Sequence, residues 1–384
     1  MTTIIGIEST AHTFGVGIVK DGKIVANCRD AYTTDSGGIV PMDAAKHHER
    51  VSFNVYENAL NVAKVREGEI DAIAFSQGPG LAPCLIQGIK FAKFLSKKLE
   101  VPLVPVNHCI AHLEVGRVTK AKDPVMLYTS GANTQIIAYS SGKFRIFGET
   151  LDVGVGNFID TFARYAGIGF PGGPEIERLA KKGKNFIELP YSVKGMDISL
   201  SGILTNLRQK LDKMNLYSPS AHKIDDSKST SSDFLLKKNV NAKSLSRNSP
   251  SKGGGGLSNF PLVSEQSEAN YTLADLAFSL QETVFSMLVE VAERALAHTG
   301  KKELLLGGGV ACNSRLQEMC QIMCKERGAK FFCPERTVLV DNGAMIAFLG
   351  EIEFNSGVHF FGEDAENLDI MPRQRTDEVE VTWR

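Results

Sequence analysis

The sequence predicts an α/β protein made of two similar domains that face each other across a cleft. Strand patterns and helix patterns alternate along the chain, and one strand–turn–strand module recurs after 120 residues. The chain has 384 residues, 43% of them hydrophobic and 23% charged, which is ordinary globular composition and enough length for two domains.

The first module opens the chain. Residues 4–7 form a short apolar strand, residues 8–13 a polar turn and residues 14–19 a second strand. The pair Asp21-Gly22 is a hairpin-turn signal, and it leads into a third strand over residues 24–27.

The second module repeats this order. Residues 125–128 are apolar, residues 129–133 are a polar turn, and residues 135–139 form a strand. A further turn at residues 141–143 leads into the last strand, residues 144–147. The two lysine-ended turns, Asp-Gly-Lys and Ser-Gly-Lys, are 120 residues apart, which indicates an internal duplication.

Each module then leads to helices and one more strand that ends in glycines. In the first half, residues 70–75 precede Gly78-Pro79-Gly80, and in the second half residues 303–306 precede residues 307–309. Short turns and helix starts of this kind present backbone N–H groups that suit phosphate or carboxylate ligands. A single turn would be read as a plain hairpin, but four in symmetric places favour a nucleotide-type cleft.

Residues 218–268 differ from the rest in composition. They hold 13 serines and four successive glycines, too few apolar side chains to offset the entropy of ordering them. We expect a disordered insertion between two helices, residues 202–214 and 273–298. Its basic residues are either solvated or available to RNA: Lys223, Lys228, Lys237, Lys238, Lys243, Arg247 and Lys252.

The domain limits follow from these patterns. We expect a first domain over residues 1–122 and a second over residues 123–345, interrupted by the insertion. The C-terminal segment, residues 346–384, is expected to pack back on the first domain.

Charge and cysteine content exclude several classes of protein. With 43 basic and 44 acidic side chains the net charge is −1, so the chain is not basic all over, although a local basic patch stays possible. Lys181, Lys182, Lys184 and Lys194 are candidates for such a patch, or are ordinary solvated lysines. No apolar run is long enough to span a membrane. Seven cysteines without a Cys-x-x-Cys pair, and no targeting signal, predict a reduced protein of the cytoplasm and nucleus.

One pair of histidines has the spacing of metal ligands. An apolar strand over residues 101–106 leads to Asn107, a good helix N-cap, and His108 and His112 then lie at i and i+4 on one helical face. The residue after His108 is Cys109, so the Glu base of zinc proteases is missing. Tyr128 is a candidate third ligand.

Two other assignments leave alternatives open. Asp341 is a candidate fourth ligand or a plain helix N-cap, and Tyr128 is equally a half-buried strand residue. His47 and His48 resemble a polar helix face more than a ligand pair. No nucleophile stands beside an evident base, so the catalytic residues stay unknown, and positioning with charge stabilisation is the expected chemistry.

These segments together resemble the TsaD family, also called O-sialoglycoprotein endopeptidase-like proteins, in its archaeal and eukaryotic branch. That branch is the catalytic subunit of the KEOPS complex. The likeness covers nearly the whole chain outside the insertion. The motifs that carry it are Gly6-Ile7-Glu8, Ala45-Lys46-His47-His48, Gly78-Pro79-Gly80, residues 107–112, residues 128–133, residues 147–152, residues 195–199, residues 279–283, Asp341-Asn342-Gly343-Ala344 and residues 375–384.

The resemblance implies the actin-like ATPase (ASKHA) fold, with two duplicated RNase H-like domains and a cleft between them. It implies tRNA N6-adenosine threonylcarbamoyltransferase activity: transfer of threonylcarbamoyl from threonylcarbamoyl-AMP to N6 of the adenosine 3′ of the anticodon in ANN-decoding tRNAs. The implied partners are tRNA, a kinase-like subunit, its small binding partner and a small dimerising subunit. An ATP-like nucleotide is expected to fit the same site.

The resemblance also implies the site residues. One divalent metal ion, Fe or Zn, would be held by His108, His112, Tyr128 and Asp341. The adenylate would be held by Tyr128, Thr129, Ser130, Gly131, Ala132, Asp160, Gly173, Glu177 and Asn313.

Three features depart from the family pattern: Ala132 in place of the usual Gly, Ser9 in place of the Gly usual after Glu8, and the insertion. Three other functions fit these residues less well. An ATP-hydrolysing or kinase-like enzyme of the same fold would use carboxylates and Mg²⁺ rather than a histidine pair. A metalloprotease would need a Glu where Cys109 stands. A non-enzymatic subunit would not need the ligand set.

Overall fold

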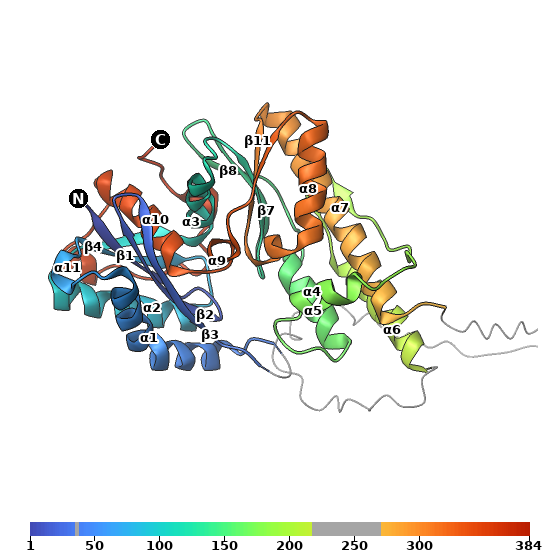
Figure 1. Ribbon diagram of the computed structural model, residues 1–384, viewed down its shortest axis with the longest axis horizontal. Helices are drawn as coiled ribbons and strands as arrows, with labels where there is room; N and C mark the ends of the chain where they lie inside the picture. The colour runs from blue at the N-terminus through green and yellow to red at the C-terminus, as the bar shows by residue number, and fades with distance from the viewer. Residues whose placement is uncertain (35–37, 217–269) are drawn as a thin grey trace, which may run out of the picture. The chain divides into compact units, whose positions relative to one another are not determined.

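A computed structural model describes residues 1–34, 38–216 and 270–384 (Figure 1). The chain divides into a large unit, residues 1–211 and 271–384, and a short unit, residues 212–270. The predicted insertion at residues 218–268 lies outside the described residues, and so do its seven basic side chains.

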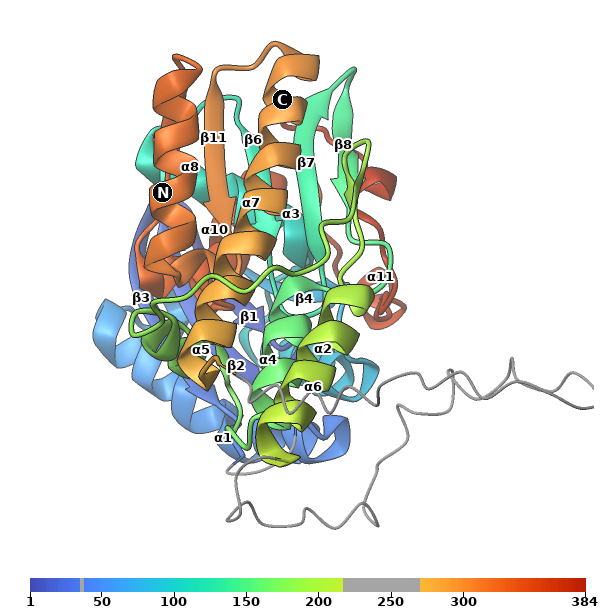
Figure 2. The same ribbon diagram turned by 90° about the vertical axis from the view of Figure 1, so that its right-hand side faces the viewer.

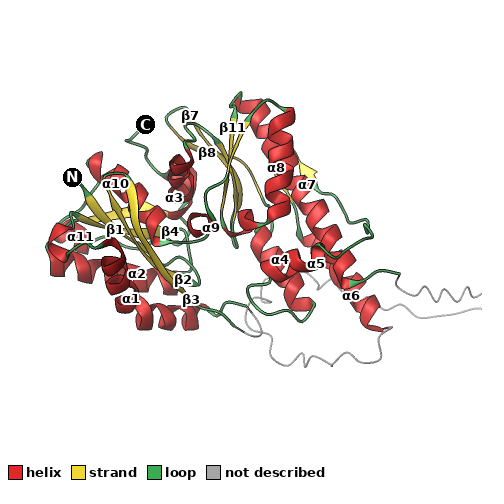
Figure 3. Cartoon of the chain, viewed as in Figure 1, coloured by secondary structure: helices red, strands yellow, loops and turns green. Residues whose placement is uncertain are grey.

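Within the described residues, the large unit contains two five-stranded sheets of the same topology (Figure 3). The first has the order β3-β2-β1-β4-β5, and the second has the order β8-β7-β6-β11-β12 when read in the same sense. In each, the first strand pairs antiparallel with a hairpin partner on one side and parallel with a late strand on the other. The strands of the first sheet are β1 (Thr3–Glu8), β2 (Thr13–Lys20), β3 (Lys23–Ala31), β4 (Ala72–Gly78) and β5 (Leu103–Asn107). Those of the second are β6 (Val125–Thr129), β7 (Thr134–Ser140), β8 (Lys143–Glu149), β11 (Glu303–Gly307) and β12 (Lys330–Phe332).

The duplication extends to the hairpins. Asp21 and Gly22 both have positive φ (49° and 74°), and Ser141 and Gly142 repeat this (52° and 83°). Positive φ at both central residues defines the type I′ turn that suits the twist of a hairpin. Each hairpin also contains an irregularity in register, after Ile18 in β2 and after Ile136 in β7. The predicted repeat is therefore confirmed down to the turn type.

Helices cover the sheets, and both helices predicted beside the insertion are confirmed. The helices of the first half are α1 (Pro41–Ala63), α2 (Ala82–Leu99), α3 (His108–Glu114) and the 3₁₀ segments Glu67–Glu69 and Val115–Thr119. Those of the second half are α4 (Val155–Tyr165), α5 (Gly173–Ala180), α6 (Ser201–Leu216), α7 (Leu273–Thr299), α8 (Ser314–Glu326) and the 3₁₀ segment Gly309–Cys312, with the short hairpin β9 (Val193–Lys194) and β10 (Asp197–Ile198). The last elements are α9 (Arg336–Leu339), α10 (Gly343–Asn355), α11 (Glu363–Glu366) and the 3₁₀ segment Thr376–Glu378.

Helix α10 packs directly on β1 and β2 of the first sheet. A Cβ on Gly17 would lie 2.1 Å from the backbone nitrogen of Ala344, and one on Gly343 would lie 2.2 Å from the nitrogen of Gly17. Only glycine at both positions allows the backbones to come this close. The predicted limits at residues 122 and 345 themselves stay a prediction.

One hydrophobic core joins the two sheets through α3 and α10. It contains buried Val106 from the first sheet, Met126 and Leu305 from the second, Ile110 from α3 and Met345 from α10. The residues between β5 and β6 are thus fixed from both sides. None of the helices in the described part of the chain combines the length and apolarity needed to cross a membrane.

Candidate metal and substrate site

Helix α3 begins where β5 ends and carries the histidine pair. The Asn107 side chain accepts hydrogen bonds from the backbone N–H groups of Cys109 (3.0 Å) and Ile110 (3.1 Å), which confirms the predicted N-cap. The i, i+4 spacing puts His108 and His112 on one face, with ring centroids 4.8 Å apart.

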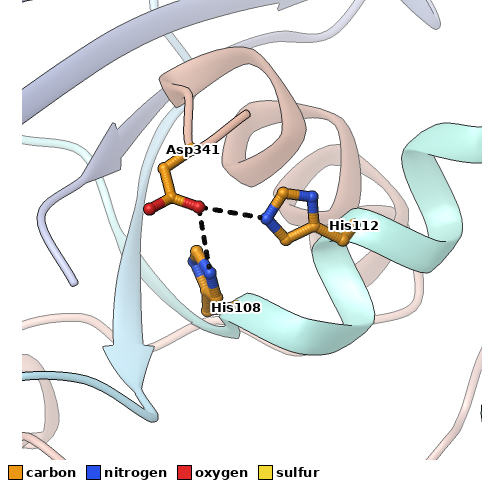
Figure 4. Close-up of side chains that lie close together, drawn as sticks. All are labelled: His108, His112 and Asp341. Atoms are coloured by element: carbon orange, nitrogen blue, oxygen red, sulfur yellow. Dashed lines mark hydrogen bonds and ion pairs between the residues drawn. The ribbon is translucent and has the colours of Figure 1, made fainter. Parts of the chain in front are cut away.

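Asp341 meets both histidines (Figure 4). Its Oδ1 lies 3.3 Å from Nε2 of His112 and 3.5 Å from Nε2 of His108, and the three ligand atoms are all within 4.8 Å of one another. The alternative reading of Asp341 as a helix N-cap is wrong, because Asn342 caps α10 by accepting from the Met345 N–H at 3.0 Å. The Asp341 carboxylate is therefore turned to the histidines, which hold its pKa well below the usual value despite its burial.

Tyr128 lies near the end of β6, beside this cluster. Its side chain is fully buried, not half-buried as the plain strand reading expects, and its ring centroid lies 5.1 Å from that of His112. The hydroxyl has no hydrogen-bond partner among the described residues. Buried hydroxyl groups are rarely left unpaired, so this one fits a donor atom to a bound group. Two imidazoles, a carboxylate and this phenol oxygen make a donor set that suits a divalent transition metal.

Glu8 orients the first histidine. It is fully buried at the end of β1, and its Oε2 lies 2.9 Å from Nδ1 of His108, while its Oε1 accepts from the Thr10 N–H at 2.7 Å. Burial alone would lower the pKa of His108, but the Glu8 carboxylate raises it to about 9. A metal ion would therefore have to displace the Nε2 proton, while the Nδ1 proton stays donated to Glu8. The sequence alone did not assign this role to Glu8. It could have been suspected because the parallel strands β1 and β5, which precede Glu8's turn and His108, end at the same edge of the first sheet.

The predicted ligand turn follows Tyr128 directly. Ser130 donates its N–H to the Asn133 carbonyl at 2.9 Å, and Gly131 and Ala132 are exposed at the tip. The start of α4 supports the turn, because the Gly156 N–H donates to the Ser130 carbonyl at 3.0 Å.

A Cβ on Gly156 would lie 2.7 Å from Cα of Gly131, so glycine is needed for this approach. Thr129 is buried, and its hydroxyl donates to the Gly307 carbonyl at 3.2 Å. The turn is therefore held rigidly by α4 and β11.

The other predicted substrate residues lie on α4, α5 and the start of α8. Asp160 accepts from the Gly172 N–H at 2.8 Å, and burial raises its pKa. Gly173 begins α5, and a Cβ there would meet nothing within 4 Å, so this backbone faces open space.

Two of the predicted residues already have protein partners. Glu177 accepts from the Ser314 hydroxyl at 2.6 Å and pairs with Lys181 at 3.0 Å. Asn313 caps α8 through Oδ1, and its amide donates to Gln281 at 2.9 Å. A bound nucleotide would compete with these contacts.

The interpretation of His47 and His48 as a polar helix face is wrong, since both are buried in α1. His48 packs against Phe14, with ring centroids 5.6 Å apart, and burial lowers its pKa to about 4. His47 lies 2.9 Å from the Asp30 carboxylate. Neither ring joins the His108 cluster.

Comparison with known sequences decides the family. The sequence model of TsaD, tRNA N6-adenosine threonylcarbamoyltransferase, matches residues 23–348. The chain belongs to the TsaD family. A transferase that acts on tRNA is therefore the established class of this enzyme.

Other TsaD-family members match along the whole chain. The tRNA N6-adenosine threonylcarbamoyltransferase of Thermococcus kodakarensis is 46% identical over 99% of both chains. The probable enzyme of Drosophila melanogaster is 42% identical over 100% of this chain and 99% of its own. A probable bifunctional tRNA threonylcarbamoyladenosine biosynthesis protein of Methanosarcina mazei is 43% identical over 100% of this chain and 60% of its own.

Among solved structures, HypF of Thermococcus kodakarensis superposes with a TM-score of 0.53 at 15% identity. The match covers 92% of this TsaD-family chain and 48% of HypF, and it concerns the fold alone. Together with the duplicated sheets, it identifies the actin-like ATPase fold that the resemblance implied.

Proposed function

We propose that this chain transfers threonylcarbamoyl from threonylcarbamoyl-AMP to N6 of the adenosine 3′ of the anticodon in ANN-decoding tRNAs. In this proposal it is the catalytic subunit of a KEOPS complex. The observation that carries the proposal is the cluster of His108, His112 and Asp341, joined through Tyr128 to the exposed turn of residues 130–133.

His108, His112, Tyr128 and Asp341 would hold one divalent metal ion, iron or zinc, since nitrogen and oxygen donors suit both. When bound, such an ion would polarise the carbamoyl group as a Lewis acid and bind the threonyl end of the substrate. Glu8 keeps the His108 ring in the orientation this needs. The half-buried Asp341 carboxylate offsets the positive charge.

The turn of residues 129–132 and the open backbone at Gly173 would receive the adenylate. Asp160 is placed to accept from a ribose hydroxyl once its Gly172 contact is exchanged or shared. An ATP-like nucleotide would fit the same positions. Because the polar atoms of Glu177 and Asn313 face protein groups, we propose that they hold helices together at the edge of this site. Glu177 joins α5 to the start of α8, and Asn313 joins the start of α8 to Gln281 of α7.

The transfer needs no enzyme-bound intermediate. N6 of the adenosine attacks the carbamoyl carbon, the bond from that carbon to the AMP phosphate oxygen breaks, and AMP leaves with the electron pair. One N6 proton is released. The thiol nearest the cluster, Cys109, is buried, and burial raises its pKa to about 12, so it stays protonated and is no candidate nucleophile.

Helices α1 and α2 support the assignment to a complex, because they expose an aromatic patch. Phe53 and Phe94 are 51% and 48% exposed, with ring centroids 5.5 Å apart, and both pack on Phe91. Exposed apolar patches of this kind mark protein contacts. We propose that a partner subunit covers it. Seven free cysteines suit the reducing cytoplasm and nucleus, where we expect the complex to work.

The test is reconstitution with tRNA, threonine, bicarbonate, ATP, an adenylate-forming enzyme and the partner subunits. We expect threonylcarbamoyladenosine at the position 3′ of the anticodon, measured by mass spectrometry of digested tRNA. Product that is missing with every component present contradicts the proposal. Phosphate release that is independent of tRNA would instead favour an ATPase.

A further inference from the structure

The segment that follows α5 passes along α7 (Figure 2). It carries aromatic and basic side chains. We call residues 182–195 the strap. Its Phe186 and Tyr191 are 57% and 53% exposed, although large aromatic side chains are normally covered. Lys182, Lys184 and Lys194 are exposed on the same segment.

The strap is held firmly, although Val193–Lys194 of β9 is its only regular element among the described residues. Buried Asp275 at the start of α7 accepts from the backbone N–H groups of Lys184 and Asn185, both at 2.8 Å. The Ile187 N–H donates to the Ser279 hydroxyl at 2.7 Å. A Cβ on Gly183 would lie 2.5 Å from the Ala274 carbonyl oxygen, so the chain passes α7 at backbone contact distance.

The far end of the strap is held by side chains of α7. The Tyr191 hydroxyl bonds Glu290, and Arg294 donates to the Gly195 carbonyl. Phe186 is therefore presented between two fixed points, with its ring toward solvent. Such preorganisation lowers the entropy cost of binding a partner.

The charge of the strap is locally positive in a chain of net charge −1. Lys182, Lys184 and Lys194 have no acidic group within 4.0 Å among residues 1–34, 38–216 and 270–384, whereas nearby Lys181 is paired with Glu177. Glu188 is the one exposed acid of the strap. Unpaired lysines can neutralise the phosphates of a polyanion and so release the cations condensed on it.

The spacing suits single-stranded nucleic acid. Phe186 and Tyr191 are five positions apart on an extended segment, up to about 16 Å, so each ring can stack on a different unpaired base. The strap also begins near the site, because α5 runs from Gly173 to Ala180, about 12 Å. An anticodon loop is single-stranded RNA of this kind.

We propose that the strap is a tRNA-binding surface. Lys182, Lys184 and Lys194 contact backbone phosphates, and Phe186 and Tyr191 stack on loop bases while the target adenosine reaches the cleft. This inference rests on the proposed function for its choice of the anticodon loop.

The first test removes the three charges in the reconstituted complex, as K182A/K184A/K194A. We expect tRNA affinity to fall at least tenfold near physiological salt, and the slope of log K against log salt to fall by about two. The KM for tRNA should rise with kcat unchanged. The matched control, K23A/K143A/K325A, removes three exposed lysines from β3, β8 and α8, and should bind tRNA as the wild type does.

The second test changes the ring alone. Phe186→Ala should weaken tRNA binding about fivefold or more without changing the salt slope, and Phe186→Trp should restore it. The proposal would be overturned if the strap variants bound tRNA with the same affinity as the control triple variant. So would strap variants that lose a partner subunit in pull-down while keeping tRNA affinity, because the strap would then be a protein contact. A wild-type complex that binds tRNA without forming product contradicts only the proposed function.

Discussion

At the scale of single residues, the site depends on side chains that orient other side chains. Glu8 fixes the tautomer of His108. Asn107 caps α3, which carries both histidines, and Asn342 caps α10, which begins just after Asp341. The ligand candidates were visible in the sequence because two of them share one helix at a recognisable spacing. Glu8 was not, because its partner is 100 positions away.

The first prediction concerns this contact. Glu8→Gln should lower the affinity of the site for zinc or iron by about 10- to 100-fold, because the His108 ring loses its charged acceptor. Competition with a chromophoric chelator measures this. Glu351→Gln is the control: it also alters a buried carboxylate, one that accepts from the Gly22 N–H at 2.8 Å, and should leave metal affinity unchanged. Equal affinities in wild type and Glu8→Gln would contradict the role of Glu8.

The second prediction concerns Asp275. Backbone N–H groups of Asn185, Lys184 and Thr272 hold its pKa well below the ordinary 3.8. A carboxyl group whose pKa is lowered by folding stabilises the protein above its unfolded value and loses that contribution as pH falls toward the folded value.

Asp275→Asn should therefore reduce the free energy of unfolding by about 2–3 kcal/mol at pH 7. The difference in free energy of unfolding between the variant and the wild type should become smaller as the pH falls below about 4. Urea unfolding at several pH values measures it, and a gap that is constant with pH would contradict the charge-based explanation.

At the scale of elements, the decisive feature is backbone contact between α10 and the first sheet. Gly6, Gly17 and Gly343 allow it. It brings Asp341, two residues before α10, to the histidines on α3. Sequence pattern found the strands and long helices, because their periodicity is local. It did not find that α1 buries His47 and His48, because that depends on β2 and β3 lying against the helix.

The third prediction tests the close approach. Gly17→Ala should lower the free energy of unfolding by about 3 kcal/mol or more, because its methyl group would overlap the Ala344 backbone. Gly202→Ala is the matched control: it lies in α6 with nothing within 4 Å, and should be neutral or slightly stabilising. Denaturant unfolding compares them. Equal free energies of unfolding for the two variants would contradict this prediction, because α10 would then be able to shift and accommodate the methyl group.

At the scale of the whole molecule, duplication explains most of what the sequence predicted. The Asp-Gly and Ser-Gly turns revealed it, and the two sheets repeat one topology. The clustering of His108, His112 and Asp341 was implied by family resemblance rather than by pattern, since Asp341 is 229 positions from His112. The protein partners of Glu177 and Asn313 could not be foreseen, because their hydrogen bonds join separate elements.

The fourth prediction concerns assembly. Phe53→Glu with Phe94→Glu should weaken capture of a partner subunit at least tenfold, because a charge would enter the apolar contact, while the circular dichroism spectrum stays unchanged. Ile322→Glu, at a residue 53% exposed on α8, is the control. If the double variant captures the partner subunit as well as the wild type does, the partner binds a surface other than the Phe53 and Phe94 patch.

The most direct measurement is threonylcarbamoyladenosine formation by the reconstituted complex carrying His108→Ala and His112→Ala. Wild type should form product, the double variant should fall below about 1% of that rate, and His298→Ala with His359→Ala, two exposed histidines elsewhere, should match wild type. Full activity of the His108/His112 variant in a folded complex would contradict the assignment of the reaction to this site.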